Sequence, residues 1–253
     1  MSIYTIENVF VPLRSGPSHK SEMLSQLLFG EKFTISGAAG SWIKVLTLFD
    51  NYEGWVDGDH LHSIECSDDS RGTVLSRNLI CFRPDGTRII LEPGCEVNSP
   101  DFKNKSFKVG GVSYTTQTEF SEGFVGVSGS MPETAQRFIN APYIWGGRVP
   151  SGIDCSGLAQ LVYKIWGKRL PRDSWKQALE GTTISFLEES RPGDLVFFDN
   201  ETGSINHVGM IYSEGLVIHA SGMVRIDPLD QTGIYRKERK GYSHKLRIIK
   251  RHE

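Results

Sequence analysis

Long hydrophobic runs and an excess of charge of either sign are both missing from this sequence. Its apolar runs are only a few residues long, far short of the ~18 that span a bilayer, which argues against a membrane-spanning helix. The formal net charge of −2 offers no basic field to hold nucleic acid or an anionic membrane surface. The first eight residues contain no charged segment followed by an apolar one, so no secretory signal is recognised.

Cysteine is also scarce, and no Cys-x-x-Cys pair is present. If one of the four cysteines acts as a free thiol, the other three cannot all pair, so a disulfide framework is not expected. Together with the missing signal, this predicts a protein of the reducing cytoplasm, unless a leader has been removed. The four residues are Cys66, Cys81, Cys95 and Cys155.

What is present indicates two or three small domains. A chain of 253 residues is long enough for about two domains at ~100–200 residues each, or for three smaller ones. Short apolar segments separated by turn residues predict an all-β domain over residues 1–64 and a second β-rich domain over 65–129, joined by a polar linker at 66–72. Strands are expected at residues 9–11, 33–35, 42–45 and 54–56.

The pattern changes near residue 130 and predicts an α+β domain over residues 130–253. Ser130 and Glu133 form a capping-box pattern, and Asp154 precedes a helix over residues 155–166 as an N-cap. The apolar face of that helix and the strands that follow it indicate helices first and an antiparallel sheet afterwards. The expected strands are 195–198, 208–212, 216–219 and 224–226, with a solvated edge strand at 245–249.

Cys155 is the candidate nucleophile. It lies in the first turn of the expected helix, where unpaired N–H groups and the macrodipole favour a negative charge, so we expect its thiol pKa to be lowered. Glycines on both sides, at 146–147, 152 and 157, are expected to let a substrate backbone approach the thiol. We interpret Cys155 as reactive rather than as a buried structural cysteine.

Two histidines can supply the base and the group that orients it. His207 and His219 lie on neighbouring expected strands, and a tight hairpin with its apex near Ser213 would place them directly opposite one another. Opposed residues have Cβ atoms ~4.5–5.5 Å apart, within reach of an imidazole–imidazole hydrogen bond. A one-residue change of register would separate them.

These residues lie in motifs that resemble the NlpC-type cell-wall cysteine peptidases, which have a papain-like fold. The resemblance covers about residues 131–235. It implies that Cys155 is the nucleophile, His207 the base and His219 the orienting residue, with Tyr143 beside the thiol. The motifs are Pro142-Tyr143-Ile144-Trp145-Gly146-Gly147, Asp154-Cys155-Ser156-Gly157, Pro192-Gly193-Asp194-Leu195-Val196-Phe197-Phe198, Asn206-His207-Val208-Gly209 and Ile218-His219-Ala220-Ser221.

The N-terminal domain resembles bacterial SH3-like domains, through Val11-Pro12-Leu13-Arg14, Ser25-Gln26-Leu27-Leu28-Phe29-Gly30-Glu31 and Tyr52-Glu53-Gly54-Trp55-Val56. More narrowly, it is similar to those that precede the peptidase domain in intracellular γ-D-glutamyl-L-diamino acid endopeptidases of murein recycling. In that subfamily a tyrosine and an acidic residue bind the free amino terminus of the substrate. The tyrosine matches Tyr52, and the acidic residue matches Glu22, with Glu31 as the alternative. Asp154 and Ser156 are carried over as further residues of the amine pocket.

The resemblance implies a papain-like cysteine peptidase domain preceded by two SH3-like barrels. Its expected reaction is hydrolysis of the γ-D-glutamyl bond in L-Ala-γ-D-Glu-diamino acid peptides, with a Cys155 thiolate paired to a His207 imidazolium. The Cys155 backbone N–H and the Tyr143 hydroxyl would meet the oxyanion. No cofactor, metal, nucleic acid or membrane partner is expected, and the chain is expected to be a monomer.

Two alternatives belong to other classes. One is an exported peptidoglycan hydrolase that uses its SH3-like domains as wall anchors. The other is a catalytically silent binding module of the same fold. The identity of the diamino acid and the role of residues 65–129 stay open.

Overall fold

The structure is a computed structural model that describes residues 2–66, 72–117, 121 and 127–252. The chain divides into two compact units, residues 1–127 and 128–253. Most of the expected linker, residues 67–71, lies outside the described residues. The division of the first unit into two separate domains stays a prediction. Among the described residues, no helix is both long enough and apolar enough to cross a membrane.

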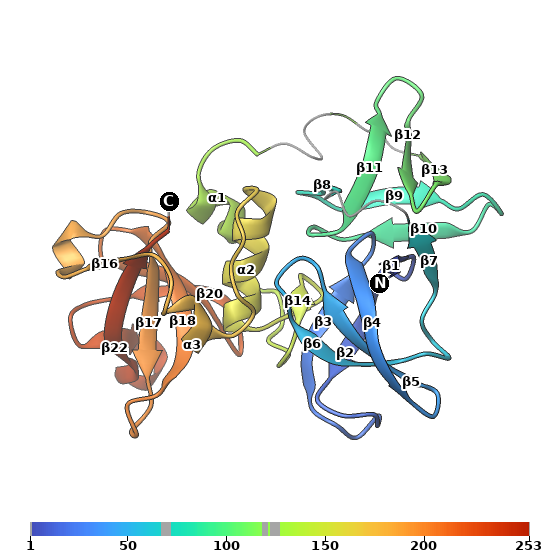
Figure 1. Ribbon diagram of the computed structural model, residues 1–253. Coiled ribbons are helices and arrows are strands. Elements are labelled where there is room, and N and C mark those ends of the chain that lie inside the picture. Colours follow the sequence, from blue (N-terminus) through green and yellow to red (C-terminus); the bar gives the residue numbers. More distant parts are fainter. Residues whose placement is uncertain (1, 67–71, 118–120, 122–126, 253) are drawn as a thin grey trace. The chain divides into compact units, whose positions relative to one another are not determined.

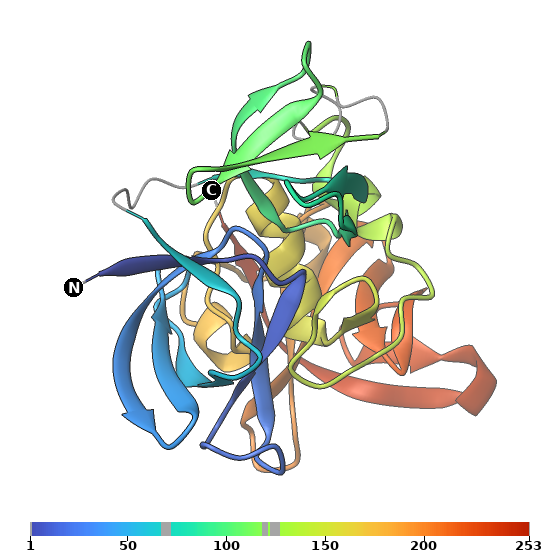
Figure 2. The same ribbon diagram turned by 90° about the vertical axis from the view of Figure 1, so that its right-hand side faces the viewer.

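The first sheet of unit 1 has seven antiparallel strands in the order β3-β2-β6-β5-β4-β1-β7, which curl around one apolar core (Figures 1 and 2). Alternation sets which side chains face that core: in β2, Val11 and Leu13 are buried, whereas Phe10 before them is exposed and Pro12 between them is only partly buried. All four strands expected from the sequence in this region are confirmed. The strands are β1 (Ile3–Ile6), β2 (Phe10–Arg14), β3 (Met23–Leu28), β4 (Lys32–Ala39), β5 (Trp42–Thr47), β6 (Glu53–Asp57) and β7 (Ser63–Cys66).

The second sheet of unit 1 has six strands in the order β10-β9-β13-β12-β11-β8. It packs on the first sheet through Phe29, whose ring contacts Phe107 and Tyr114 edge-on. The backbone N–H of Glu96 donates to the Phe29 carbonyl at 2.8 Å, which joins the two sheets further. The strands are β8 (Thr73–Val74), β9 (Leu79–Phe82), β10 (Arg88–Leu91), β11 (Glu96–Asp101), β12 (Ser106–Val109) and β13 (Val112–Thr116).

Unit 2 places its helices before and beside one antiparallel sheet, as an α+β domain should. Among the residues that the structure describes, strands far outnumber helices. The helices are α1 (Met131–Gln136), α2 (Cys155–Ile165) and α3 (Ser174–Gln177). The strands are β14 (Arg148–Val149), β15 (Gly152–Ile153), β16 (Thr182–Ile184), β17 (Leu195–Asp199), β18 (Ile205–Ser213), β19 (Leu216–Ser221), β20 (Met223–Pro228), β21 (Gly233–Arg236) and β22 (Gly241–Arg251).

Helix α2 lies against β18 and β19 of the sheet, which runs β16-β22-β17-β18-β19-β20 with β21 paired to β22 (Figure 1). The sequence predicted one apolar face, but every residue of α2 is buried, including Gln160 and Lys164. The Gln160 side chain donates to the Leu170 carbonyl at 2.9 Å. The helix that begins at Cys155 is therefore buried on every face.

The helix starts expected from the sequence are confirmed. The Ser130 hydroxyl accepts from the Glu133 N–H and the Glu133 carboxylate accepts from the Ser130 N–H, which completes a capping box at α1. The Asp154 carboxylate accepts from the Gly157 N–H at 2.7 Å and caps α2.

The C-terminal strand differs from the expectation. Residues 245–249 were expected to form a solvated edge strand, but β22 lies between β16 and β17 and also pairs with β21. Ile249 and Lys250 are buried there. The many lysines and arginines of this segment suggested exposure, whereas pairing on both sides places the strand inside the sheet.

Candidate active site

The Cys155 thiol lies at the first residue of α2 and is only 6% exposed. Two backbone N–H groups, of Val208 and Ser156, donate hydrogen bonds toward the sulfur. Since Val208 follows His207 on β18, the contact brings the thiol to the strand that carries the expected base. Tyr143 is close enough for the Cys155 charge to contribute to raising the pKa of its phenol, although burial contributes more.

Asp154, before the thiol, is a saturated hydrogen-bond acceptor. Arg172 donates to both oxygens of its carboxylate, with Nη1 3.0 Å from Oδ1 and Nη2 2.6 Å from Oδ2. The backbone N–H groups of Gly146 and Gly157 also donate to it, at 2.8 and 2.7 Å. Ser156 joins the cluster, since its hydroxyl donates to Asp154 at 3.2 Å and accepts from Arg172 at 2.8 Å. This arrangement fixes the start of α2, and a role of Asp154 and Ser156 in binding an amine stays a prediction.

Arg172 was not identified from the sequence. It is 2% exposed, and a buried guanidinium at that position needs a carboxylate partner. No pattern in the neighbouring sequence indicates its role, because its carboxylate partner, Asp154, lies 18 residues earlier.

The glycines around Cys155 serve the packing of this segment, and the expectation that they open a path for a substrate backbone is wrong for two of them. A Cβ on Gly157 would lie 2.1 Å from the Gly147 carbonyl oxygen, and a Cβ on Gly147 would lie 2.1 Å from the Gly152 oxygen. Each glycine is required because another backbone segment already occupies the space. Residues 146–154 therefore pack tightly against the first turn of α2.

The expected lowering of the Cys155 pKa is also wrong. Burial raises the pKa of the thiol to about 12, the neighbouring Asp154 carboxylate raises it further, and the Val208 N–H opposes both. The helix terminus does favour a thiolate, but loss of water and an adjacent negative charge outweigh it. With its pKa raised this far, Cys155 is a neutral thiol at pH 7.

His207 and His219 meet as expected, but by a different register. Gly209, not His207, stands opposite His219: the turn is at Glu214–Gly215 instead of Ser213, and with a one-residue bulge between Ile211 and Ser213 the net shift of the pairing is two positions. A two-residue shift keeps both side chains on the same face of the sheet, so the diagonal pair still meets. His207 Nε2 lies 2.9 Å from His219 Nδ1, with the rings at 85° to one another.

Both histidines are neutral in this environment. Burial lowers the pKa of His207 well below 6.5, and the nearby His219 and His244 lower it further. Burial also lowers the pKa of His219, against the opposing hydrogen bond to Asp227. The resting pair is therefore a thiol and an imidazole, in place of the expected thiolate and imidazolium.

Asp227 on β20 extends the chain of side chains and was missed in the sequence. Its Oδ2 lies 2.9 Å from His219 Nε2, and Arg225 binds the same carboxylate with Nε at 2.5 Å and Nη2 at 2.7 Å. Applying the same pairing argument to the next hairpin would have predicted this contact. The turn at Gly222 brings β20 back beside β19, with Arg225 opposite His219 and Asp227 two residues farther along β20.

His244 on β22 was also missed. Its ring stacks on that of His207 with centroids 4.0 Å apart and an interplanar angle of 21°. Burial, followed by His219 and Arg236, lowers the His244 pKa to about 4, so the ring is neutral at pH 7. The assignment of β22 as a solvated edge strand concealed this contact.

The three histidines place one ring nitrogen each within 4.8 Å of the others, the only such group of potential metal ligands found in the described part of the chain. One nitrogen of His207 and one of His219 are already used in the hydrogen bond that joins the two rings. The observed contacts join the histidines to one another: a hydrogen bond links His207 to His219, and His244 stacks on His207.

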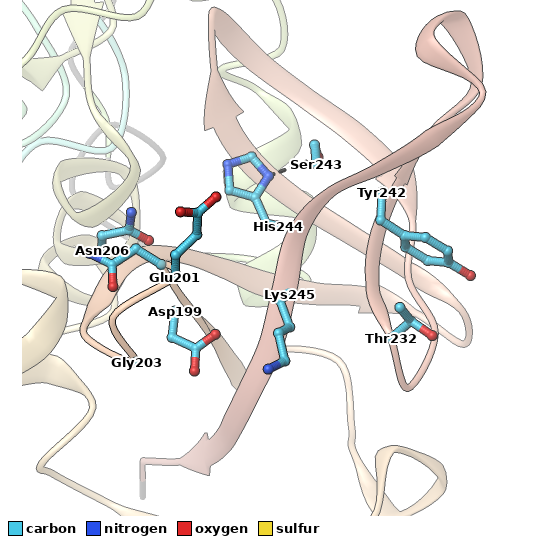
Figure 3. Close-up of a pocket in the computed structure, with 10 residues that line it drawn as sticks. Asp199, Glu201, Gly203, Asn206, Thr232, Tyr242, Ser243, His244 and Lys245 are labelled. Atoms are coloured by element: carbon cyan, nitrogen blue, oxygen red, sulfur yellow. Dashed lines mark hydrogen bonds between the residues drawn. The ribbon is translucent and has the colours of Figure 1, made fainter.

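A polar pocket of about 780 Å³ borders the histidine cluster through His244. Figure 3 shows His244 and Glu201 toward one end of it and Thr232 and Tyr242 at the other. Both signs of charge line it. The full lining is Asp199, Asn200, Glu201, Gly203, Asn206, Thr232, Tyr242, Ser243, His244 and Lys245.

The remaining expected residues belong to unit 1. Tyr52 is half-buried before β6, where it packs on the apolar core and its N–H donates to Thr47 Oγ1 at 2.8 Å. Glu22 is exposed just before β3. Glu31 is 1% exposed and accepts from the Leu28 N–H at 2.9 Å. Which of the two acidic residues contacts an amine stays a prediction.

Comparison with known proteins agrees with this geometry. Residues 140–241 match the NlpC/P60 family, and residues 13–61 match the bacterial dipeptidyl-peptidase Sh3 domain. The chain is 27% identical to a γ-D-glutamyl-L-lysine dipeptidyl-peptidase of Bacillus subtilis, over 92% of this chain and 84% of that protein. A protein of the same description from Bacillus cereus is also 27% identical, over 85% of this chain and 73% of that one.

A crystal structure of an NlpC/P60 family protein from Bacillus cereus shares the fold, with a TM-score of 0.81 over 99% of both chains at 21% identity. The family match covers the segment that holds Cys155, His207 and His219. The second unit is therefore a cysteine peptidase domain of the NlpC/P60 family, and a bacterial SH3 domain precedes it in the chain.

Proposed function

We propose that this protein hydrolyses the γ-D-glutamyl–diamino acid bond of murein peptides that carry a free N-terminal L-Ala. The observation that carries the proposal is the Cys155 thiol beside the strand of the His207–His219 pair, in a domain of the NlpC/P60 family. Two γ-D-glutamyl-L-lysine dipeptidyl-peptidases resemble the chain across both of its units, which supports this bond as the target.

In the proposed reaction the thiol loses its proton as it attacks. The Cys155 sulfur adds to the γ-carbonyl carbon while its proton passes to His207, because neither group is charged in the resting site. The C=O electron pair moves to the oxygen, where the Cys155 backbone N–H and the Tyr143 hydroxyl stabilise the oxyanion. His207 then protonates the leaving amine, the C–N bond breaks, and a thioester remains on Cys155.

Water completes the cycle. His207, neutral again, takes a proton from water as the oxygen adds to the thioester carbonyl. The tetrahedral intermediate collapses with loss of the Cys155 sulfur, which recovers its proton from His207. His219 holds the His207 ring throughout by the 2.9 Å hydrogen bond.

The polar pocket beside His244 is compatible with the leaving residue. A diamino acid carries an ammonium and a carboxylate group, and the pocket presents the carboxylates of Asp199 and Glu201 together with the Lys245 ammonium. The free L-Ala ammonium is assigned to Tyr52 and Glu22, with Asp154 and Ser156 as the further amine-pocket residues. A site built around an ammonium group discriminates strongly against an acylated amine, because its polar groups then lose their partner.

The experiment compares three substrates by mass spectrometry of the products: L-Ala-γ-D-Glu-L-Lys, its N-acetylated form and intact sacculi. Cleavage of the free tripeptide to L-Ala-D-Glu and lysine, at least ~100-fold faster than the acetylated peptide, is expected. Equal cleavage of the acetylated peptide, or release of fragments from sacculi, would refute the free-amine requirement and favour a wall hydrolase.

Glu22→Gln and Tyr52→Phe test the residues assigned to the ammonium group. Each should raise KM for the free tripeptide and reduce its advantage over the acetylated form. Glu65→Gln is the matched control, since Glu65 is an exposed glutamate of the same sheet. If Glu22→Gln behaves like the control, Glu22 does not bind the ammonium.

A recycling role in the cytoplasm, as a monomer, completes the proposal. A peptide with a free amino terminus is a fragment already released from the wall, so its hydrolysis salvages amino acids. Cell fractionation with an antibody against the protein tests the location, and recovery in the culture medium would contradict it. Light scattering of the purified protein tests the monomer.

A further inference from the structure

The Asp227 carboxylate is a fixed negative charge behind the histidine pair. Its side chain is 6% exposed, and Arg225 binds both of its oxygens, at 2.5 and 2.7 Å. Burial raises the carboxyl pKa, but hydrogen bonds from His219 and Arg225 outweigh burial and hold the pKa well below its usual range. An ionised carboxylate has no proton to donate, so Asp227 is an acceptor only.

This constraint determines the tautomer of His219. The 2.9 Å contact between His219 Nε2 and Asp227 Oδ2 requires the proton on Nε2. Because His219 is buried and neutral, its other nitrogen, Nδ1, then carries a lone pair. His219 presents an acceptor to His207.

The same reasoning determines the tautomer of His207. His207 Nε2 lies 2.9 Å from the His219 Nδ1 lone pair, so Nε2 must carry the proton and donate. A neutral imidazole has one proton, which leaves Nδ1 of His207 as the basic nitrogen. Of the two nitrogens, only Nδ1 can take the thiol proton.

We propose that Asp227 is a positioning residue that selects Nδ1 of His207 as the base. It acts through His219 and touches neither the thiol nor the substrate. When His207 gains its second proton, the hydrogen bonds along the chain keep their direction, so no side chain has to reorient during the reaction. The inference rests on His207 as the base of the proposed function and is independent of the identity of the substrate.

An amide in place of Asp227 would remove the selection. Asparagine can accept from His219 Nε2 with its oxygen or donate to it with its nitrogen. In the second case His219 carries its proton on Nδ1 and donates to His207 Nε2, which forces the His207 proton onto Nδ1. That tautomer has no free base on the required nitrogen.

The direct test uses the unmodified protein and needs no substrate. Long-range ¹H–¹⁵N NMR spectra of protein labelled with ¹⁵N-histidine distinguish the two neutral tautomers of each ring. We expect protonated Nε2 and bare Nδ1 for both His207 and His219 at pH 7. A proton on Nδ1 of either residue would overturn the proposal, whatever the turnover of any peptide. Correct tautomers with no turnover would instead contradict the proposed function.

Variants then separate positioning from simple support of the fold. Asp227→Asn should lower kcat by roughly 10- to 1000-fold with little change in KM, less than the ~10⁴-fold loss known for an aspartate that contacts a catalytic histidine directly. Its NMR spectra should show His219 in mixed tautomers. Asp227→Glu, which keeps the carboxylate, should recover part of kcat.

Asp85→Asn is the control, because Asp85 is an exposed aspartate of unit 1 that accepts from the Thr87 N–H, outside the histidine chain. It should keep wild-type kcat and tautomers. An Asp227→Asn variant with wild-type kcat, or with lowered kcat but wild-type tautomers, would overturn the positioning role. If that variant fails to fold, the histidine tautomers of the unmodified protein, measured by NMR, still test the proposal.

Discussion

His207 and His219 are hydrogen-bonded at 2.9 Å although they are two positions out of register in the β18–β19 hairpin. The residue opposite His219 is Gly209, and a Cβ there would lie 3.2 Å from the His219 Cβ and 2.5 Å from Val217 Cγ2. The missing side chain leaves room for the diagonal contact. The orientation of the proposed base thus depends on one glycine and on the ring that lies across from it.

Replacing the two histidines should have unequal effects. His207→Ala removes the base and should lower kcat/KM by at least ~10²- to 10⁴-fold. His219→Gln should retain measurable activity, above that of His219→Ala, because a glutamine oxygen can still accept from His207 Nε2. Steady-state kinetics on the free tripeptide provide the measurement. Wild-type activity in both His219 variants would show that the hydrogen bond does not orient the base.

The acid limb of the pH profile should lie below pH 6.5. Burial lowers the pKa of His207 from that ordinary value, so the imidazole stays neutral and able to accept the thiol proton to a lower pH than usual. Activity is lost only as the pH falls through the lowered pKa. kcat/KM measured between pH 4 and 9, with circular dichroism to confirm folding, reports this value. An acid limb at or above pH 6.5 disagrees with a buried, neutral His207.

The resting thiol should be protonated at neutral pH. Because burial and Asp154 raise the Cys155 pKa to about 12, the ultraviolet difference spectrum between wild type and Cys155→Ala should show no thiolate absorbance at pH 7. Absorbance should appear only in strongly alkaline solution. A thiolate signal already present at pH 7 would restore the ion pair suggested by the helix position of Cys155.

The buried Asp154–Arg172 pair should stabilise unit 2. Arg172→Met leaves the Asp154 charge buried, with its hydrogen bonds reduced, and should cost about 3–5 kcal/mol. By calorimetry, the melting temperature of the second unit should fall by roughly 10–20 °C. Lys176→Met is the control, since its ion pair with Asp173 is partly exposed to solvent and should contribute at most about 1 kcal/mol. Equal melting temperatures for the two variants would show that Arg172 does not stabilise the start of α2.

The sequence predicted the features that depend on local patterns. The caps at Ser130 and Asp154 are set by side chains within three residues of the helix start, and both are confirmed. Strands such as β17 and β19 follow from short apolar segments bounded by turns. The position of Cys155 at a helix start follows from the same signals.

Features that depend on distant contacts could not be predicted in this way. The Cys155 pKa is decided by burial, which a helix position does not reveal. His244 stacks on His207 because β22 enters the middle of the sheet, and no pattern near residue 244 indicates that pairing. The register predicted for the β18–β19 hairpin was wrong by two residues. The His207–His219 contact was still predicted because a shift of two residues leaves both side chains on the same face of the sheet.

Product analysis with Cys155 variants tests the central claim most directly. Wild-type protein and Cys155→Ala are each incubated with L-Ala-γ-D-Glu-L-Lys, and the products are identified by mass spectrometry, with circular dichroism to confirm folding. The account predicts L-Ala-D-Glu and lysine from the wild type and none above background from Cys155→Ala, since the nucleophile is absent. Cleavage at the L-Ala–D-Glu bond by the wild type, or the same products at an undiminished rate from folded Cys155→Ala, would contradict it.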